Sequence, residues 1–334
     1  MDKVAVLGFG SSGRRLFSIV RERLPQAEFL VFSSQDLSGQ GFPTTTELSD
    51  VTRFEPTIAI VSGVASQRLE MVRALPSKMC GVLVEKPLAM NFYEASQVTK
   101  ELEHRSAVTQ VGFNLRFSPS LREFRNRVLS LSLGKLLSVR AETGQYLPGW
   151  RVGRDYRSTA SATEKLGGGV LRELSHEIDY LGWIFGDVEW VSAWTGQQSE
   201  LEIDVEDTAH LTLGFRSEPS LVGQLNIDFV RHDATRSITA VCAEGTMQWD
   251  GIGGCVKEWA QGGHQWEVSF SEKPNEPTTY EAQWDSFYSA VKSGTTPAVT
   301  ADDGLAVLSV IDGARESHET GGLRIAPEQR GQGR

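Results

Sequence analysis

The first third of the chain alternates short apolar runs with stretches of helical periodicity. The apolar runs occupy residues 4–7, 28–32, 58–61, 81–84 and 109–113, and the helical stretches between them occupy 13–24, 66–75 and 92–104. Each apolar run is short enough for a strand that is buried on both faces. Strands that alternate with helices predict an α/β fold with a parallel, doubly wound sheet.

A different pattern begins near residue 135, where apolar and polar residues alternate over longer runs. These runs occupy residues 135–146, 188–195, 208–215, 221–229, 237–242 and 266–270. They predict a large, open, mostly antiparallel sheet with one covered and one solvated face. Helices expected at 119–131, 171–185, 280–292 and 301–318 would cover it, which makes this part an α+β domain. We therefore expect domains at 1–118 and 119–326, and a polar, disordered tail at 327–334.

Composition narrows the class of protein. The 334 residues are 40% hydrophobic and 23% charged, as in ordinary globular proteins. A net charge of −10 disfavours a nucleic-acid partner, because phosphate binding needs a concentrated basic surface. The chain has no signal-peptide pattern, no apolar span of membrane length, and three cysteines without metal spacing. We expect a cytoplasmic protein with no membrane association and no metal.

A glycine-rich turn follows the first apolar run. It lets the backbone approach a pyrophosphate and aims the amides at a helix N-terminus toward it. The alternative is a simple glycine-rich turn, but the position between a strand and an amphipathic helix favours a dinucleotide site in a Rossmann domain. The expected cofactor-binding residues in this turn are Gly8, Phe9, Gly10, Ser11, Ser12 and Gly13.

The residues that follow the second apolar run, 28–32, bear on the choice between NAD and NADP as the cofactor. An acidic residue there would bind the 2′-hydroxyl of NAD, but Ser33 and Ser34 occupy this position. Small hydroxyl residues leave room for a 2′-phosphate, and Arg14 or Arg15 could supply positive charge. The sequence therefore favours NADP modestly. The alternative is an NAD ribose held by Asp36 or by a backbone amide.

Lys86 stands in the segment Glu85-Lys86-Pro87, directly after the run 81–84. Proline cannot continue a strand and restricts the residue before it, so the run should end in a rigid corner. Open α/β sheets bind ligands outside the carboxyl ends of their strands, which is where Lys86 would lie. The alternative is a charge at the strand end that pairs with Glu85.

A second candidate site lies on the segment 166–180, where a glycine-rich loop precedes a helix. Helical spacing would place Glu173, His176 and Tyr180 on one face, so a carboxylate could orient a histidine. Histidine is the side chain best suited to exchange a hydroxyl proton near neutral pH. The alternative is a surface helix with a capping glutamate and an incidental histidine.

These segments together resemble the Gfo/Idh/MocA oxidoreductase family over nearly the whole chain. The resemblance rests on 8–13 (GFGSSG), 85–87 (EKP), 112–119 (GFNLRFSP), 166–180, 287–290 (FYSA) and 302–304 (DDG). It implies a Rossmann domain followed by a mixed domain with an open sheet. It also implies NAD(P)-dependent oxidation or reduction at a carbinol of a sugar, cyclitol or nucleotide-linked sugar.

The resemblance also implies roles for single residues. Lys86 matches the active-site lysine of the family, and His176 matches its acid-base histidine. Glu173 matches only approximately, since many members have an aspartate four residues before the histidine, and Asp179 is the competing partner. In the stretch 62–67, glutamine replaces the usual histidine. Further cofactor-side residues are Ser62, Gln67, Glu85, Lys86 and Asn114, and Arg116 joins Lys86 and His176 on the substrate side.

An insert at 145–162 resembles a subgroup associated with surface-polysaccharide or amino-sugar pathways. Its expected substrate contacts are Trp150, Arg151 and Tyr156. Arginines at 151, 154 and 157 present planar donor forks that suit a carboxylate or a phosphate. The alternatives are a solvated loop or an oligomer contact.

Hydride transfer requires an oriented carbinol, a proton acceptor and charge stabilisation. Because an ordinary lysine is protonated at neutral pH, Lys86 should donate a hydrogen bond to the reacting oxygen while His176 relays its proton. Two other functions stay open: a glycoside hydrolase that retains NAD, and a non-catalytic protein that senses the cofactor. A homodimer or homotetramer is expected if one face of the second sheet is uncovered and apolar.

Overall fold

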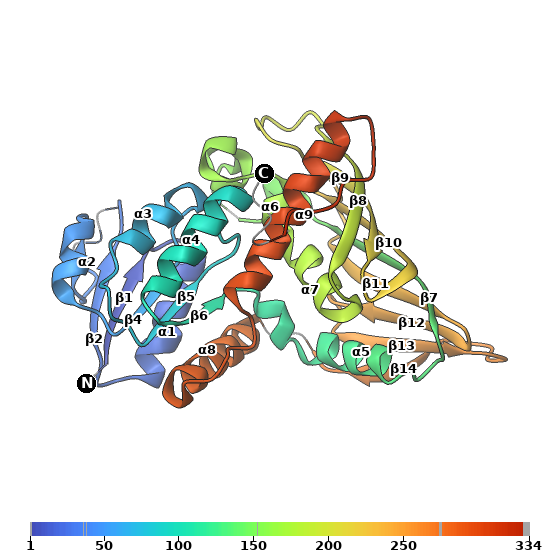
Figure 1. The fold of residues 1–334 in the computed structure, drawn as a ribbon, viewed down its shortest axis with the longest axis horizontal. Coiled ribbons are helices and arrows are strands. Elements are labelled where there is room, and N and C mark those ends of the chain that lie inside the picture. The colour runs from blue at the N-terminus through green and yellow to red at the C-terminus, as the bar shows by residue number, and fades with distance from the viewer. Residues whose placement is uncertain (1, 36, 38, 152, 274–275, 330–334) are drawn as a thin grey trace. The chain divides into compact units, whose positions relative to one another are not determined.

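The computed structural model describes residues 2–329, apart from 36, 38, 152 and 274–275, and separates into two compact units (Figure 1). Unit 1 combines Met1–Asn114 with Glu276–Leu308, and unit 2 combines Leu115–Asn275 with Ser309–Arg334. The sequence-based division at residue 118 lies close to the first boundary. The two divisions differ for 276–308, which the sequence assigns to the second domain.

Unit 1 contains a parallel sheet of six strands in the order β3-β2-β1-β4-β5-β6, which confirms the doubly wound prediction. The short β3 and the helix α2 after it were not expected from the sequence. The strands are β1 Lys3–Leu7, β2 Glu28–Phe32, β3 Thr44–Thr45, β4 Ile58–Val61, β5 Gly81–Val84 and β6 Val108–Val111. The helices are α1 Ser11–Arg23, α2 Leu48–Phe54, α3 Arg68–Arg73, α4 Phe92–His104, α8 Glu276–Ser293 and the first part of α9 Ala301–Glu319.

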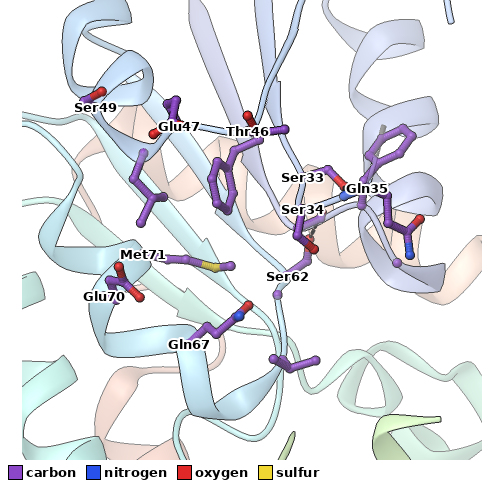
Figure 2. A pocket seen from close by; sticks show the side chains of 17 residues that line it. Ser33, Ser34, Gln35, Thr46, Glu47, Ser49, Ser62, Gln67, Glu70 and Met71 are labelled. Carbon is purple, nitrogen blue, oxygen red and sulfur yellow. Dashed lines mark hydrogen bonds between the residues drawn. The ribbon is translucent and has the colours of Figure 1, made fainter. Parts of the chain in front are cut away.

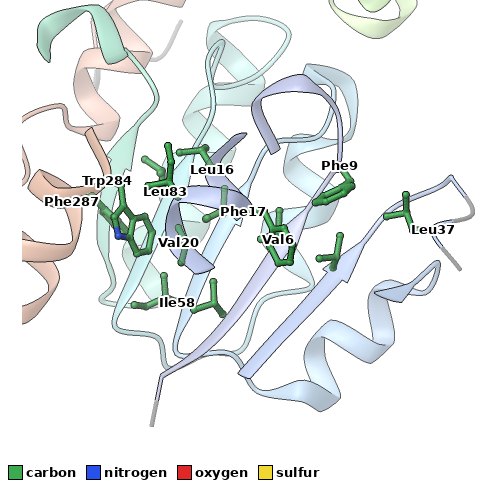
Figure 3. Packing of buried hydrophobic residues seen from close by; sticks show 14 residues of the cluster. Val6, Phe9, Leu16, Phe17, Val20, Leu37, Ile58, Leu83, Trp284 and Phe287 are labelled. Carbon is green, nitrogen blue, oxygen red and sulfur yellow. The ribbon is translucent and has the colours of Figure 1, made fainter. Parts of the chain in front are cut away.

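Helix α8 belongs to unit 1, contrary to the expectation that it covers the second sheet. Figure 3 shows Trp284 and Phe287 within the same apolar cluster as Leu16 and Val20 of α1. Both aromatic side chains are fully buried. The strand β5 begins with Gly81, where a Cβ atom would meet the ring of Phe287 at 2.8 Å. A helix far along the sequence therefore completes the core of the N-terminal sheet.

Unit 2 contains a sheet of eight strands in the order β14-β13-β12-β11-β7-β10-β9-β8. All its neighbouring strands are antiparallel except the pair β7 and β10, so the predicted open, mostly antiparallel sheet is confirmed. The strands are β7 Leu136–Gly144, β8 Val188–Gly196, β9 Thr208–Phe215, β10 Glu218–Asp228, β11 Thr235–Cys242, β12 Gly245–Asp250, β13 Cys255–Ala260 and β14 Glu267–Ser271.

Helices cover one face of this sheet. They are α5 Pro119–Leu129, α6 Val170–Glu173, α7 Ser175–Phe185 and the C-terminal half of α9 Ala301–Glu319. Helix α5 packs on β12, β13 and β14, whereas α6 packs on β9 and β10. The hydroxyl of Ser317 in α9 accepts a hydrogen bond of 2.9 Å from the amide of Ala193 in β8. Of the two C-terminal helices, only α9 contributes to unit 2.

The opposite face of the sheet mixes aromatic and polar side chains. The strand register aligns Trp194 with His210, and Gln224 with Arg140, across neighbouring strands of this face. Trp194 is 39% exposed, and Gln224 and Arg140 are exposed. This face is therefore solvated, as the alternating pattern predicts, and Trp194 adds some apolar area to it. Among the described residues, no helix combines the length and the apolar character that crossing a membrane would require.

Replacing Trp284 with alanine should test the assignment of α8 to unit 1. The change empties a fully buried site, so the free energy of unfolding of unit 1 should fall by about 3–5 kcal/mol. Denaturant unfolding followed by circular dichroism measures the change. The matched control is Trp266→Ala, since that side chain is 41% exposed. A loss below about 1 kcal/mol for Trp284→Ala would contradict the assignment.

Candidate functional site

The turn between β1 and α1 is closed by backbone packing that only glycine permits. Gly8 has φ of +96°, and its amide donates a hydrogen bond of 2.9 Å to the carbonyl of Phe32. A Cβ atom on Gly8 would collide with the backbone of Gly63, and one on Gly13 would collide with the carbonyl oxygen of Gly8. By contrast, a Cβ atom on Gly10 would meet nothing within 4 Å. Gly8 and Gly13 are therefore required by the packing of the turn, whereas the absence of a side chain at Gly10 leaves open space next to the backbone.

A cavity of about 470 Å³ opens at the carboxyl ends of β1, β2, β3 and β4. Figure 2 shows the side chains of Ser33, Ser34, Thr46, Ser62 and Gln67 around it. Its volume is in the range of small-molecule sites, and the strand ends are where doubly wound sheets bind nucleotides. The lining residues are Gly8, Phe9, Gly10, Phe32, Ser33, Ser34, Gln35, Thr46, Glu47, Leu48, Ser49, Ser62, Gly63, Val64, Gln67, Glu70 and Met71.

The predicted cofactor-side residues divide into two groups. Those that line the cavity are Gly8, Phe9, Gly10, Ser33, Ser34, Ser62 and Gln67. Those outside its lining are Ser11, Ser12, Gly13, Arg14, Glu85, Lys86 and Asn114. The guanidinium of Arg14 lies 4.5 Å from the ring centre of Phe9. The side chain of Asn114 is 6% exposed and donates a hydrogen bond of 2.7 Å to the hydroxyl of Thr279.

The sequence did not reveal that two carboxylates, Glu47 and Glu70, line the cavity. Glu47 lies just beyond β3, which pairs with β2, and the amide of Ser33 donates to the carbonyl of Thr45 in β3. A strand of two residues has too little pattern to be recognised, so this neighbour of β2 was missed. The alternative ribose ligand Asp36 lies outside the described residues.

Lys86 is the second residue beyond the end of β5, as the sequence predicts, and the bond between Lys86 and Pro87 is cis. Its neighbour Glu85 is 4% exposed. Burial raises the pKa of the Glu85 carboxyl, whereas the positive charges of Arg68 and Lys86 and a hydrogen bond from the Lys86 amide oppose that rise. Glu85 is therefore a buried group at the corner, and the nearby positive charges favour its carboxylate form.

The second candidate segment differs from the continuous helix expected over 171–185. Helix α6 ends at Glu173, helix α7 begins at Ser175, and Leu174 between them has φ of −95° and ψ of 32°. The expected continuous helix is therefore wrong, and helical spacing alone no longer supports a shared face for Glu173 and His176. Glu173 accepts a hydrogen bond of 3.0 Å from Ser161, and His176 lies half-buried in the first turn of α7.

Asp179 forms a buried ion pair with Arg116. The Nε atom of Arg116 lies 3.1 and 2.9 Å from the two carboxylate oxygens, and its Nη2 lies 2.6 Å from Oδ1. The two side chains are 7% and 1% exposed. Charge-assisted bidentate pairs of this kind are stronger than neutral hydrogen bonds, and they also fix the relative orientation of the two side chains. Arg116, predicted to contact substrate, holds the carboxylate of Asp179.

A second buried pair supports the same helix. Glu177, fully buried on α7, accepts a hydrogen bond of 2.8 Å from Nε of Arg236 in β11. Tyr180 is also fully buried, and burial raises its pKa well above the usual value. Sequence reasoning placed Tyr180 on a face shared with His176. The structure packs it against Trp249 at 5.5 Å between ring centres.

The insert at 145–162 has a structured interior in its described part. The indole nitrogen of Trp150 donates to the carbonyl of Gln145, and the hydroxyl of Tyr156 accepts from the amide of Glu202. Arg157 forms ion pairs with two acidic residues, Asp155 and Glu202. A small hollow within the insert is lined by Leu147, Pro148, Trp150, Arg151, Arg154, Tyr156, Thr159 and Ser161.

Alanine substitutions at two glycines should separate folding from ligand binding. Gly8→Ala should lower the thermal stability of the ligand-free protein, because its Cβ atom collides with backbone and its φ is positive. Gly10→Ala should leave that stability unchanged and weaken dinucleotide binding about tenfold or more, because the open space beside it is where a pyrophosphate would approach. Thermal unfolding and fluorescence titration measure the two effects. If Gly10→Ala lowered the thermal stability as much as Gly8→Ala does, the separate roles of the two glycines would be contradicted.

Comparison with known proteins identifies both parts of the chain. The model described as "Oxidoreductase family, NAD-binding Rossmann fold" matches residues 3–113, and the GFO/IDH/MocA C-terminal domain matches 121–248. No cluster of three or more potential metal ligands occurs in the part of the chain that the structure describes.

Curated relatives include sugar and inositol enzymes. The 1,5-anhydro-D-fructose reductase of Ensifer adhaerens is 26% identical over 67% of this chain and 66% of that protein, just under two thirds of its length. The myo-inositol 2-dehydrogenase of Thermotoga maritima is 26% identical over 75% of this chain and 74% of its own.

Solved structures share the fold over the whole chain. Levoglucosan dehydrogenase in complex with NADH and L-sorbose gives a TM-score of 0.85 at 15% identity and covers 98% of this chain and 99% of that chain. The WlbA dehydrogenase from Bordetella pertussis, in complex with NADH and UDP-GlcNAcA, gives 0.81 at 17% identity and covers 98% of both chains. With family models matching the regions on either side of residue 118, the chain belongs to the Gfo/Idh/MocA family of oxidoreductases.

Proposed function

We propose that this protein transfers hydride between a nicotinamide cofactor and a carbinol or keto carbon of a sugar, cyclitol or nucleotide-linked sugar. The observation that carries the proposal is the cavity at the carboxyl ends of β1, β2, β3 and β4. Lys86 lies just beyond the carboxyl end of β5, which pairs with β4. The family assignment and the named activities of the relatives support the same reaction class.

The cavity fits the adenosine half of a dinucleotide. Gly8, Gly10 and Ser62 provide a surface of backbone and small side chains, and the open space beside Gly10 admits a pyrophosphate. The amides at the N-terminus of α1 favour negative charge there. When bound, the nicotinamide supplies the acceptor or the donor of the hydride.

The protein's own groups handle the proton and the developing charge. We propose that Lys86 donates a hydrogen bond to the reacting oxygen and stabilises its negative charge. On the family resemblance, His176 exchanges the proton of the hydroxyl with solvent. The partners seen for the two candidate carboxylates suggest supporting roles, with Asp179 anchored by Arg116 and Glu173 bonded to Ser161.

Trp150, Arg151 and Tyr156 remain our proposed substrate contacts. Trp150 and Tyr156 are ordered by backbone hydrogen bonds, and Arg151 lines the hollow beside them. Arginine beside aromatic rings suits a sugar that carries a carboxylate or phosphate group.

We also propose a cytoplasmic homo-oligomer whose subunits meet through the open face of the second sheet, where the exposed Trp194 provides apolar area.

The cavity leads us to propose NAD as the preferred cofactor, although the serines at the end of β2 favour NADP on sequence alone. A 2′-phosphate carries nearly two negative charges. Two carboxylates, Glu47 and Glu70, line the cavity, and its described lining contains no lysine or arginine. Repulsion from these carboxylates should therefore disfavour NADP.

The variant Lys86→Met should test the catalytic role. It removes the donor to the reacting oxygen, so turnover of a responsive polyol should fall by about a hundredfold or more. The dissociation constant for NAD should change less than about threefold, since Lys86 lies outside the cavity lining. Steady-state assays on a panel of sugars and cyclitols, with fluorescence titration of NAD, measure both. Turnover retained in the variant would refute the catalytic role of Lys86. If the wild-type protein binds NAD tightly but does not reduce it during turnover, the NAD-retaining glycoside hydrolase is favoured.

The preference for NAD should be visible in binding. We expect NAD to bind at least tenfold more tightly than NADP. The variant Glu47→Gln should narrow that ratio by about fivefold, because one exposed charge pair contributes roughly 1 kcal/mol at close range. Glu28→Gln is the matched control, since Glu28 is exposed at the other end of β2, outside the cavity. Tighter binding of NADP by the wild-type protein would overturn the assignment.

A further inference from the structure

Arg68 is an arginine buried at the carboxyl edge of the parallel sheet. It begins α3, and its exposed fraction is 1%. Its Nη1 atom donates to the carbonyl of Val61 at 2.8 Å and to the carbonyl of Glu85, and Nη2 donates to the carbonyl of Gly63 at 2.9 Å. All three acceptors of these hydrogen bonds are backbone oxygens.

The three carbonyls belong to the segments on which the proposed chemistry depends. Val61 is the last residue of β4, Gly63 lines the cofactor cavity, and Glu85 immediately precedes Lys86. A guanidinium presents its donors in a rigid planar fork, so it can fix several acceptors relative to one another. One side chain therefore joins the cavity turn to the corner that carries the lysine.

The peptide group between Glu85 and Lys86 is held on both sides. Its carbonyl accepts from Arg68, and its amide donates to the carboxylate of Glu85. Gly112 lies against the other side of this carboxylate, where a Cβ atom would come within 2.9 Å of Oε1. The corner thus has little freedom to rotate the Cα–Cβ direction of Lys86.

Burying this arginine is unfavourable in the absence of a specific role. Burial lowers the pKa of Arg68 to about 10, and the nearby carboxylate of Glu85 opposes that change. A buried charge without a bidentate carboxylate partner adds little to stability. Its carbonyl contacts are better explained by the geometry that they impose.

We propose that Arg68 is a positioning residue that sets the orientation of Lys86 by holding the carbonyls of Val61, Gly63 and Glu85. It does not touch the substrate, and it acts through the backbone of the corner. This inference rests on the proposed oxidoreductase function for its kinetic consequence only. The three contacts of Arg68 with backbone carbonyls, which we call the Arg68 clamp, can be measured without turnover.

Hydrogen–deuterium exchange of the intact protein reads the clamp directly. Arg68→Met should speed exchange at the amides of Glu85, Lys86 and residues 88–90 at least tenfold, while β1 in the same sheet keeps its protection. Arg73→Met is the matched control, because this arginine of the same helix is 55% exposed and pairs with Glu101. Unchanged exchange at 85–90 in a folded Arg68→Met protein would overturn the inference.

Kinetics then separate positioning from general structure. We expect Arg68→Met to lower kcat about a hundredfold, as a misplaced catalytic group does, while the dissociation constant for NAD changes less than about tenfold. Arg68→Lys, which keeps the charge and part of the donor set, should recover at least tenfold of that loss and remains informative if the methionine variant does not fold. Unaltered kcat in Arg68→Met, or equal losses in both variants, would overturn the proposal.

The double variant Arg68→Met with Glu85→Gln tests whether Arg68 merely neutralises Glu85. Positioning predicts that kcat stays low in the double variant, because the carbonyl contacts are still missing. Full recovery of kcat would show that charge compensation is the whole role and would overturn the inference. Absence of wild-type hydride transfer would instead refute the proposed function, and the exchange experiment would still decide the clamp.

Discussion

The close approach of two backbone segments at the carboxyl edge of the parallel sheet constrains the rest of unit 1. Gly8 and Gly63 lie in contact, so the turn after β1 and the turn after β4 form one continuous surface. Any side chain at Gly8 would force these turns apart. The contact leaves room for the cavity between the ends of β1, β2, β3 and β4, and it sets where α1 begins.

Buried charge supports the candidate residues in both units, by different means. In unit 2, the carboxylates of Asp179 and Glu177 on α7 are each bonded to an arginine, which fixes the helix that carries His176. In unit 1, Arg68 bonds to carbonyls and so fixes backbone below Lys86. Ion pairs orient side chains on a helix, whereas a guanidinium clamp orients a strand end, where no helical hydrogen bonds restrain the chain.

The fold class and the positions of most elements could be predicted because they depend on local periodicity. The strands β1, β4 and β5 are short apolar runs, and the structure places them within a residue of the expected bounds. The place of α8 could not be predicted, since the contact of Phe287 with Gly81 joins residues far apart in sequence. The break at Leu174 was missed for the opposite reason: helical spacing continues through it, and only the backbone angles interrupt the helix.

The candidate site was predictable where a motif carries it and not where tertiary structure assembles it. Glu47 lines the cavity because β3 pairs with β2, and a strand of two residues leaves no pattern. Gln67 and Arg68 show the same limit at a finer scale. The chain passes from a 3-10 turn at Ala65–Gln67 into α3, so neighbouring side chains point apart. Gln67 is exposed in the cavity, while Arg68 turns inward to the carbonyls. Two neighbouring polar residues thus have different roles: Gln67 lines the cavity, and Arg68 holds the backbone that leads to Lys86.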